Sequence, residues 1–173
     1  MQINDNKRLV LLALLSTIGA TVGLLENSIP IPIPVPGARL GLSNMVVLVT
    51  LVLFGLKEGI IVSLLKSLIL MLMSGNVSGF IYSFSGALFS SLAMALALKY
   101  FNQIFSLIGI SIIGSTFHNI AQIGVSAIII NNIKMFIYLP FLVLIGIITG
   151  IFVGKTSELV IQKLKLTNNF RGV

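Results

Sequence analysis

Six runs of apolar residues, separated by short polar breaks, cover most of the chain. A transmembrane helix needs about 20 mainly apolar residues. The second and third runs are shorter, so they span only with flanking turns or in a locally thinner bilayer. We predict an all-α integral membrane protein, a six-transmembrane-helix bundle that forms one domain over residues 1–173. The predicted helices cover residues 9–25, 40–54, 59–73, 80–98, 107–130 and 135–153, and residues 158–173 form a polar C-terminal tail.

The composition agrees with lipid as the surroundings of these helices. Hydrophobic residues make up 57% of the chain and charged residues 9%, whereas soluble domains carry about 25% charged residues. So few charges cannot cover a surface that faces water, and the apolar runs leave no room for a separate soluble domain. Cysteine is absent, which excludes disulfides and metal–thiolate sites. We expect no metal and no cofactor.

The basic residues are divided unevenly between the two sides of the predicted bundle. Eight lie at the termini or in the second and fourth loops, two (Arg39 and Lys134) lie on the other side, and Lys66 lies inside the third helix. Because basic loops remain in the cytoplasm, we predict a multi-pass protein of the cell membrane with both termini cytoplasmic. Scattered basic residues are typical of topology signals and lipid contacts, so nucleic acid is not an expected partner. A cleaved signal peptide is the disfavoured alternative for the first run.

A proline-rich segment follows the first predicted helix on the outer side. Proline occupies positions 30, 32, 34 and 36, and each proline removes an amide donor and bars the α region for the residue before it. The segment must therefore be extended. We favour a lid over a pocket, with Pro32, Pro34 and Pro36 as the capping residues. The alternative is a rigid linker on the membrane surface.

Polar side chains inside the predicted helices are the candidate binding groups, because such groups are costly in lipid and usually face an interior or a cavity. Lys66 lies near mid-depth, and no acidic residue is expected beside it. It either snorkels to a headgroup, faces a partner or meets an anionic ligand. His118 and Gln122 are four residues apart and share a helix face. The candidate substrate-binding residues are Arg39, Asn44, Lys66, Asn76, His118, Asn119 and Gln122.

Small residues spaced four apart recur in the first, fourth and sixth predicted helices. Such stripes let another helix approach closely, within the chain or from a partner subunit. In the first helix the candidate partner-docking residues are Ser16, Gly19, Ala20 and Gly23.

Acidic residues are too few and too scattered for the usual catalytic arrangements. The chain has only Asp5, Glu26, Glu58 and Glu158, whereas magnesium-dependent chemistry on a diphosphate needs clustered carboxylates. The one histidine has no carboxylate partner for a triad, and a phosphate-binding P-loop is absent. We therefore expect no catalytic residues, no enzymatic activity and no ATPase of its own.

The tract Pro-x-Pro-Gly-Ala-Arg-Leu-Gly-Leu-Ser-Asn at residues 34–44 resembles the Gx transporter family, which is also labelled heptaprenyl diphosphate synthase component I. Segments 74–80, 83–88 and 117–122 are similar to it too, so the likeness covers residues 8–155. That family looks related to the substrate-binding S components of energy-coupling factor (ECF) transporters. The resemblance implies six helices, a first outer loop that caps the ligand, and small residues of the first helix that dock on a coupling subunit.

The same resemblance implies a substrate-binding subunit of an uptake transporter. It would capture a small anionic, isoprenoid or vitamin-like molecule and act with a transmembrane coupling subunit and cytoplasmic ATPases. One alternative is a non-catalytic membrane component I of a heptaprenyl diphosphate synthase system. Another is an assembly subunit that has no binding pocket.

Overall fold

A computed structural model describes residues 5–29 and 38–166, and in these residues it is built from helices joined by short connections. The all-α prediction with six α-helices is confirmed for this part of the chain. The elements are α1 (Asp5–Glu26), α2 (Asn44–Phe54), α3 (Leu56–Ser74), α4 (Val77–Phe101), α5 (Leu107–Ile130), the 3₁₀-helix η1 (Ile133–Tyr138) and α6 (Leu139–Leu166).

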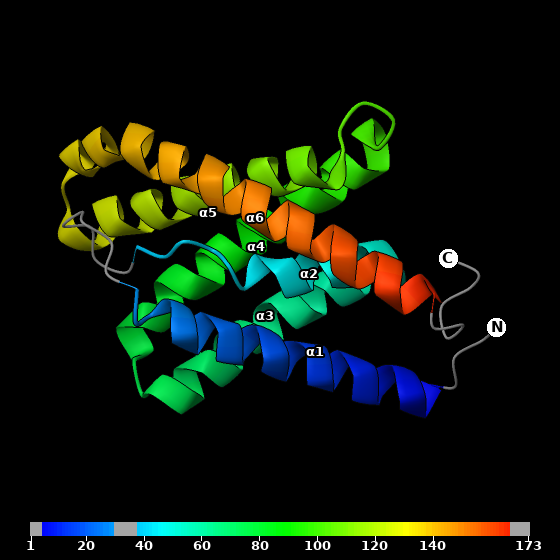
Figure 1. The fold of residues 1–173 in the computed structure, drawn as a ribbon. Coiled ribbons are helices and arrows are strands. Elements are labelled where there is room, and N and C mark those ends of the chain that lie inside the picture. The colour runs from blue at the N-terminus through cyan, green and yellow to red at the C-terminus, as the bar shows by residue number, and fades with distance from the viewer. Residues whose placement is uncertain (1–4, 30–37, 167–173) are drawn as a thin grey trace.

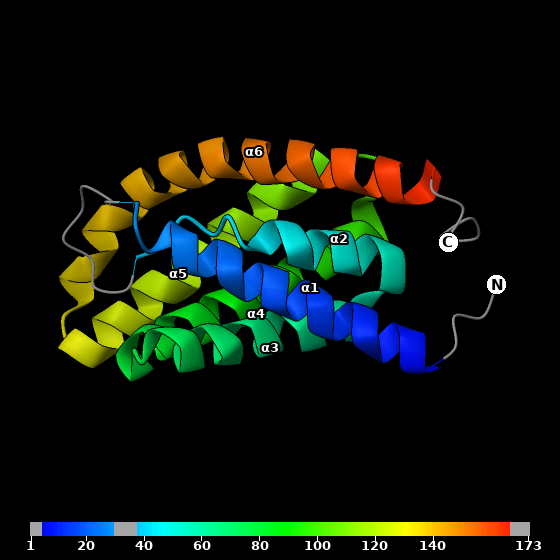
Figure 2. The same cartoon turned by 60° about the horizontal axis from the view of Figure 1, so that its bottom comes forward.

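The helices run roughly along one common direction, and α2 lies between α1 and α6 (Figures 1 and 2). Eight of the 11 residues of α2 are buried, so this helix faces other helices almost all round. An 11-residue helix is only about 16 Å long and cannot cross a bilayer alone. The first residue of α2 therefore lies inside the bundle, where the preceding segment 38–43 meets it.

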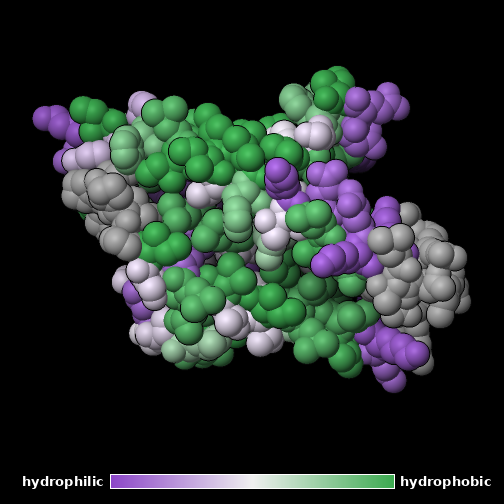
Figure 3. All heavy atoms as spheres, in the orientation of Figure 1, coloured by the Kyte–Doolittle hydropathy of each residue, from purple (hydrophilic) through white to green (hydrophobic). Residues whose placement is uncertain are grey.

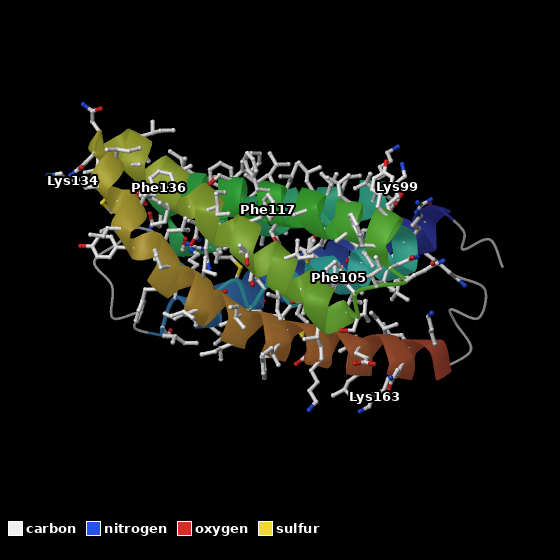
Figure 4. The ribbon with its side chains drawn as sticks, turned by 90° about the horizontal axis from the view of Figure 1, so that it is seen from above. Lys99, Phe105, Phe117, Lys134, Phe136 and Lys163 are labelled. Atoms are coloured by element: carbon white, nitrogen blue, oxygen red, sulfur yellow. The ribbon has the colours of Figure 1, made fainter. Side chains whose placement is uncertain are left out.

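Hydrophobic residues cover the middle of the visible face, and hydrophilic residues gather towards its two ends (Figure 3). Four of the described helical segments are long and apolar enough to cross a membrane, and they cover all or nearly all of α1, α4, α5 and α6. The helix α3 carries three charged residues, of which Lys66 is the one far from its ends. This distribution identifies a membrane protein. Lys99 and Lys163 lie at one end of the bundle and Lys134 lies at the other (Figure 4).

Most helix boundaries lie one to several residues from those that the apolar runs predict, and three of the differences have a clear physical cause. α6 continues to Leu166, through much of the predicted polar tail, because Ile161 is buried against Val49 and Leu53 of α2. The start predicted at residue 135 lies in η1, and α6 begins four residues later. α2 begins at Asn44 because Gly41, with φ of 80°, turns the chain just before it.

The small residues of α1 pack inside the chain. Ser16, Gly19, Ala20 and Gly23 are all buried, and a Cβ atom added at Gly19 would lie 3.3 Å from the Cδ atom of Lys66. The stripe lets α3 approach α1 closely, so this face is already covered. These four residues therefore pack against their own bundle, and their docking on a partner subunit stays a prediction.

Candidate functional site

A group of polar side chains lies inside the bundle, next to the segment that connects α1 to α2. Its members come from the end of α1, from residues 38–44, from α3 and from α5, which are far apart in sequence and meet only in the fold. We call this group the polar cluster. It consists of Glu26, Arg39, Ser43, Asn44, Lys66, His118 and Gln122.

Lys66 is the central donor of the polar cluster. Its Nζ atom donates to Ser43 Oγ at 2.8 Å and to Asn44 Oδ1 at 2.9 Å. Only 3% of the residue is exposed, so snorkelling to a headgroup is excluded as its role. Ser43 precedes α2, but its side chain makes no capping hydrogen bond and accepts from Lys66 instead. The start of α2 is thereby tied to α3.

His118 continues the hydrogen-bonded chain from α2 to α5. Its Nδ1 atom lies 3.5 Å from Asn44 Nδ2, and its Nε2 atom lies 3.0 Å from Gln122 Nε2. Gln122 Oε1 accepts from the backbone N–H of Arg39 at 3.2 Å. Lys66 donates to the amide oxygen of Asn44, and the Arg39 N–H donates to that of Gln122. The amide nitrogens of both side chains therefore face the imidazole. A ring that accepts a hydrogen bond must be the neutral imidazole, which has a single acceptor nitrogen. His118 therefore accepts from only one of the two amides, and the contact with Gln122 is the shorter one.

Glu26 is the member of the polar cluster that the sequence analysis left out of the site. It ends α1 and is 4% exposed, and its Oε1 atom accepts from the backbone N–H of Gly41 at 2.5 Å. Its carboxylate interacts electrostatically with Lys66 and Arg39. The expectation that no acidic residue lies beside Lys66 is therefore wrong. The signal was present, because Glu26 is the one acidic residue of the chain that follows an apolar run on the outer side.

Arg39 lies at the edge of the polar cluster and is half-buried. Burial lowers the pKa of its guanidinium, and the Glu26 carboxylate opposes that shift. The backbone around Arg39 is also held in place, because Leu40 O accepts a hydrogen bond from Thr149 Oγ1 of α6 at 3.1 Å. The segment that carries Arg39 is thus fixed to both α5 and α6.

Two of the predicted substrate-binding residues lie outside the polar cluster. Asn76 is exposed, and it caps α4 by accepting from the Gly79 backbone N–H at 2.7 Å. Asn119 is buried but donates to Leu142 O of α6 at 2.7 Å, which makes it a tie between two helices. The predicted capping residues Pro32, Pro34 and Pro36 lie outside the described residues.

The fold and the polar cluster define a membrane protein of several spans with a buried polar site next to its first interhelical segment. The chain belongs to the family described as heptaprenyl diphosphate synthase component I, whose model matches residues 15–160. This confirms the family that the sequence resemblance predicts.

Among solved structures, the chain is similar to one described as "Structure and mechanism of the S component of a bacterial ECF transporter". The two are 24% identical with a TM-score of 0.66, and the match covers 96% of this chain and 99% of the other. At this identity the likeness establishes the fold, and it confirms the predicted S-component architecture. No curated protein sequence matches the chain.

Proposed function

We propose that the chain is the substrate-binding subunit of an ECF-type uptake transporter, and that the polar cluster is where its small-molecule substrate binds. The observation that carries the proposal is the convergence of Asn44, Lys66, His118 and Gln122 from three helices in the bundle interior. Buried polar groups are expensive in a membrane protein and are retained where they serve a pathway or a site. A purely structural bundle has no need of a buried lysine.

Binding exchanges hydrogen bonds inside the cluster. Lys66 is bonded to Ser43 and Asn44, and Asn44 in turn lies against His118. A ligand that supplies acceptors for the lysine frees Ser43 and Asn44 for new contacts. Ser43 belongs to the segment before α2, which Gln122 and Glu26 hold in place, so a change at Ser43 strains or shifts this segment. Ligand entry is therefore coupled to the position of the first interhelical segment.

The energy for uptake comes from partners under this proposal. The sequence has no P-loop, so a transmembrane coupling subunit and cytoplasmic ATPases supply it. With both termini in the cytoplasm, as the basic residues predict, the end of α1 that carries Glu26 faces the outer side. Asn76 and Asn119 remain secondary candidates for substrate contact, because Asn119 is committed to Leu142 and Asn76 to the start of α4.

The second candidate is a non-catalytic membrane component of a heptaprenyl diphosphate synthase system, which the family description favours. The acidic side chains do not favour catalysis by this chain itself, because Glu26, Glu58 and Glu158 lie in different parts of the sequence. This candidate requires a soluble prenyl synthase that co-purifies with the chain. The length of the synthase product should then change when the chain is removed.

Native mass spectrometry of protein purified from its native host tests the capture function. We expect a retained small molecule in the wild type and a loss of at least about tenfold in its occupancy in Lys66→Met, since about 1.4 kcal/mol of lost binding suffices for that change. Lys57→Met is the matched control, because Lys57 is an exposed residue at the start of the same helix. Equal occupancy in both variants would refute the proposed site.

A further inference from the structure

The polar cluster contains an unequal number of positive and negative side chains. Lys66 and Arg39 are basic, and Glu26 is the one acidic side chain that interacts with them among the described residues. His118 adds no charge, because its ring accepts a hydrogen bond from an amide. With these groups ionised, the cluster carries one uncompensated positive charge.

Glu26 is held in the cluster by more than its charge. Its carboxylate accepts the backbone N–H of Gly41 at 2.5 Å, three residues before the start of α2. Free backbone N–H groups and the positive end of the helix dipole stabilise an anion at this position. Gly41 adopts a φ of 80° here, a conformation that glycine reaches without steric cost. The carboxylate is therefore a fixed counterion that an entering ligand does not readily displace.

An excess charge in a low-dielectric interior is costly unless a partner neutralises it. From the charge count and the anchoring of Glu26, we infer that the cluster takes a ligand with a single negative charge, and that Glu26 sets this preference as a built-in counterion. The inference rests on the proposed capture function. Carboxylates and phosphodiesters belong to the expected ligand class, whereas phosphate monoesters, with about two charges at neutral pH, lie outside it.

Four probes with the same butyl chain separate charge from shape: butanoate, butyl phosphate, butanol and butylammonium. Each is titrated against purified full-length protein at about pH 8, where a phosphate monoester is doubly charged, and apparent affinities are taken from shifts in the unfolding temperature. For the wild type we expect butanoate to bind at least about tenfold more tightly than the other three, a difference of about 1.4 kcal/mol.

Glu26→Gln is the decisive variant, because its amide keeps an oxygen that can accept from Gly41 while the site gains one positive charge. Its preference should move from butanoate to butyl phosphate, with a change in the affinity ratio of at least about tenfold. Lys66→Met removes the excess charge and should abolish the advantage of butanoate over butanol. This second variant keeps the inference testable if the first does not fold. Glu158→Gln, at an exposed position of α6, should keep the wild-type order.

Equal binding of butanoate and butanol by the wild type would overturn the inference, and so would a wild-type order of affinities in Glu26→Gln. A wild type that responds to none of the four probes would also overturn it. These outcomes do not bear on the capture function, which native mass spectrometry tests separately. A retained molecule that proves neutral or cationic in native mass spectrometry would support capture while it refutes the monoanion.

Discussion

Gly86 of α4 is the position where the smallest substitution should disturb the polar cluster. A Cβ atom added there would lie 2.6 Å from Cε1 and 2.7 Å from Nδ1 of His118. The imidazole would have to move by about 1 Å to restore ordinary van der Waals separations. Such a shift would disturb the 3.0 Å contact between His118 Nε2 and Gln122. Glycine is therefore required at this position by the close approach of the ring.

The net effect of Gly86→Ala combines two opposing terms. Overpacking a filled interior typically costs about 1–3 kcal/mol. Replacing a helical glycine by alanine gains about 0.5–1 kcal/mol. We expect the variant to lose about 1–2 kcal/mol of unfolding free energy, which corresponds to about 2–8 °C in unfolding temperature for a chain of this size. Ligand occupancy should fall as well, because the displaced ring belongs to the site.

A double-mutant cycle with His118→Ala tests this explanation by thermal unfolding of the purified protein. Without the imidazole, Gly86→Ala should be neutral or stabilising, so the coupling between the two substitutions should equal the steric cost of about 1–3 kcal/mol. Gly124→Ala in α5 is the control, since nothing lies within 4 Å of a Cβ atom added there, and it should be neutral or stabilising. Additive effects of the two substitutions would refute the steric reasoning.

Two further predictions separate stability from binding. Asn119→Ala removes the 2.7 Å hydrogen bond to Leu142 O and should lower the unfolding free energy by about 1–3 kcal/mol. Ligand occupancy per folded protein should stay unchanged in native mass spectrometry. A loss of occupancy at full stability would instead make Asn119 a binding residue. Ser90→Ala removes a fully buried hydroxyl that has no hydrogen-bond partner among the described residues, so the unfolding temperature should stay unchanged or rise. A drop of several degrees would indicate that this hydroxyl has a partner.

The helical architecture follows from the sequence because apolar runs and basic breaks report directly on the membrane. That Lys66, His118 and Gln122 face the bundle interior was also accessible, since polar side chains in the middle of apolar helices must find an interior; that they meet in one cluster was not. Asn44 was recognisable by its place at the start of a helix, although its position deep in the bundle depends on the shortness of α2. These predictions use only local sequence and the cost of polarity in lipid.

Other features depend on which helix faces which, and the sequence alone does not determine that. The small residues of α1 suit a partner subunit as well as α3, and only the fold reveals that α3 covers Gly19. The helical extension to Leu166 depends on an apolar contact of Ile161 with α2, because the segment is too polar to indicate burial by itself. Glu26 belongs to the same group, since its partners become visible only when Gly41 folds back towards it.

The hydrogen bonds of the polar cluster also restrict which part of a ligand can enter it. Lys66 gives up two acceptors, on Ser43 and Asn44, when a ligand takes their place. A hydrocarbon group offers nothing in exchange, and it would leave a buried ammonium without partners, a penalty of several kcal/mol. A site built in this way rejects molecules that lack the matching polar group far more strongly than it distinguishes between similar apolar ones. If the substrate carries an isoprenoid chain, the chain must therefore lie outside the cluster, and only the charged head group can reach Lys66.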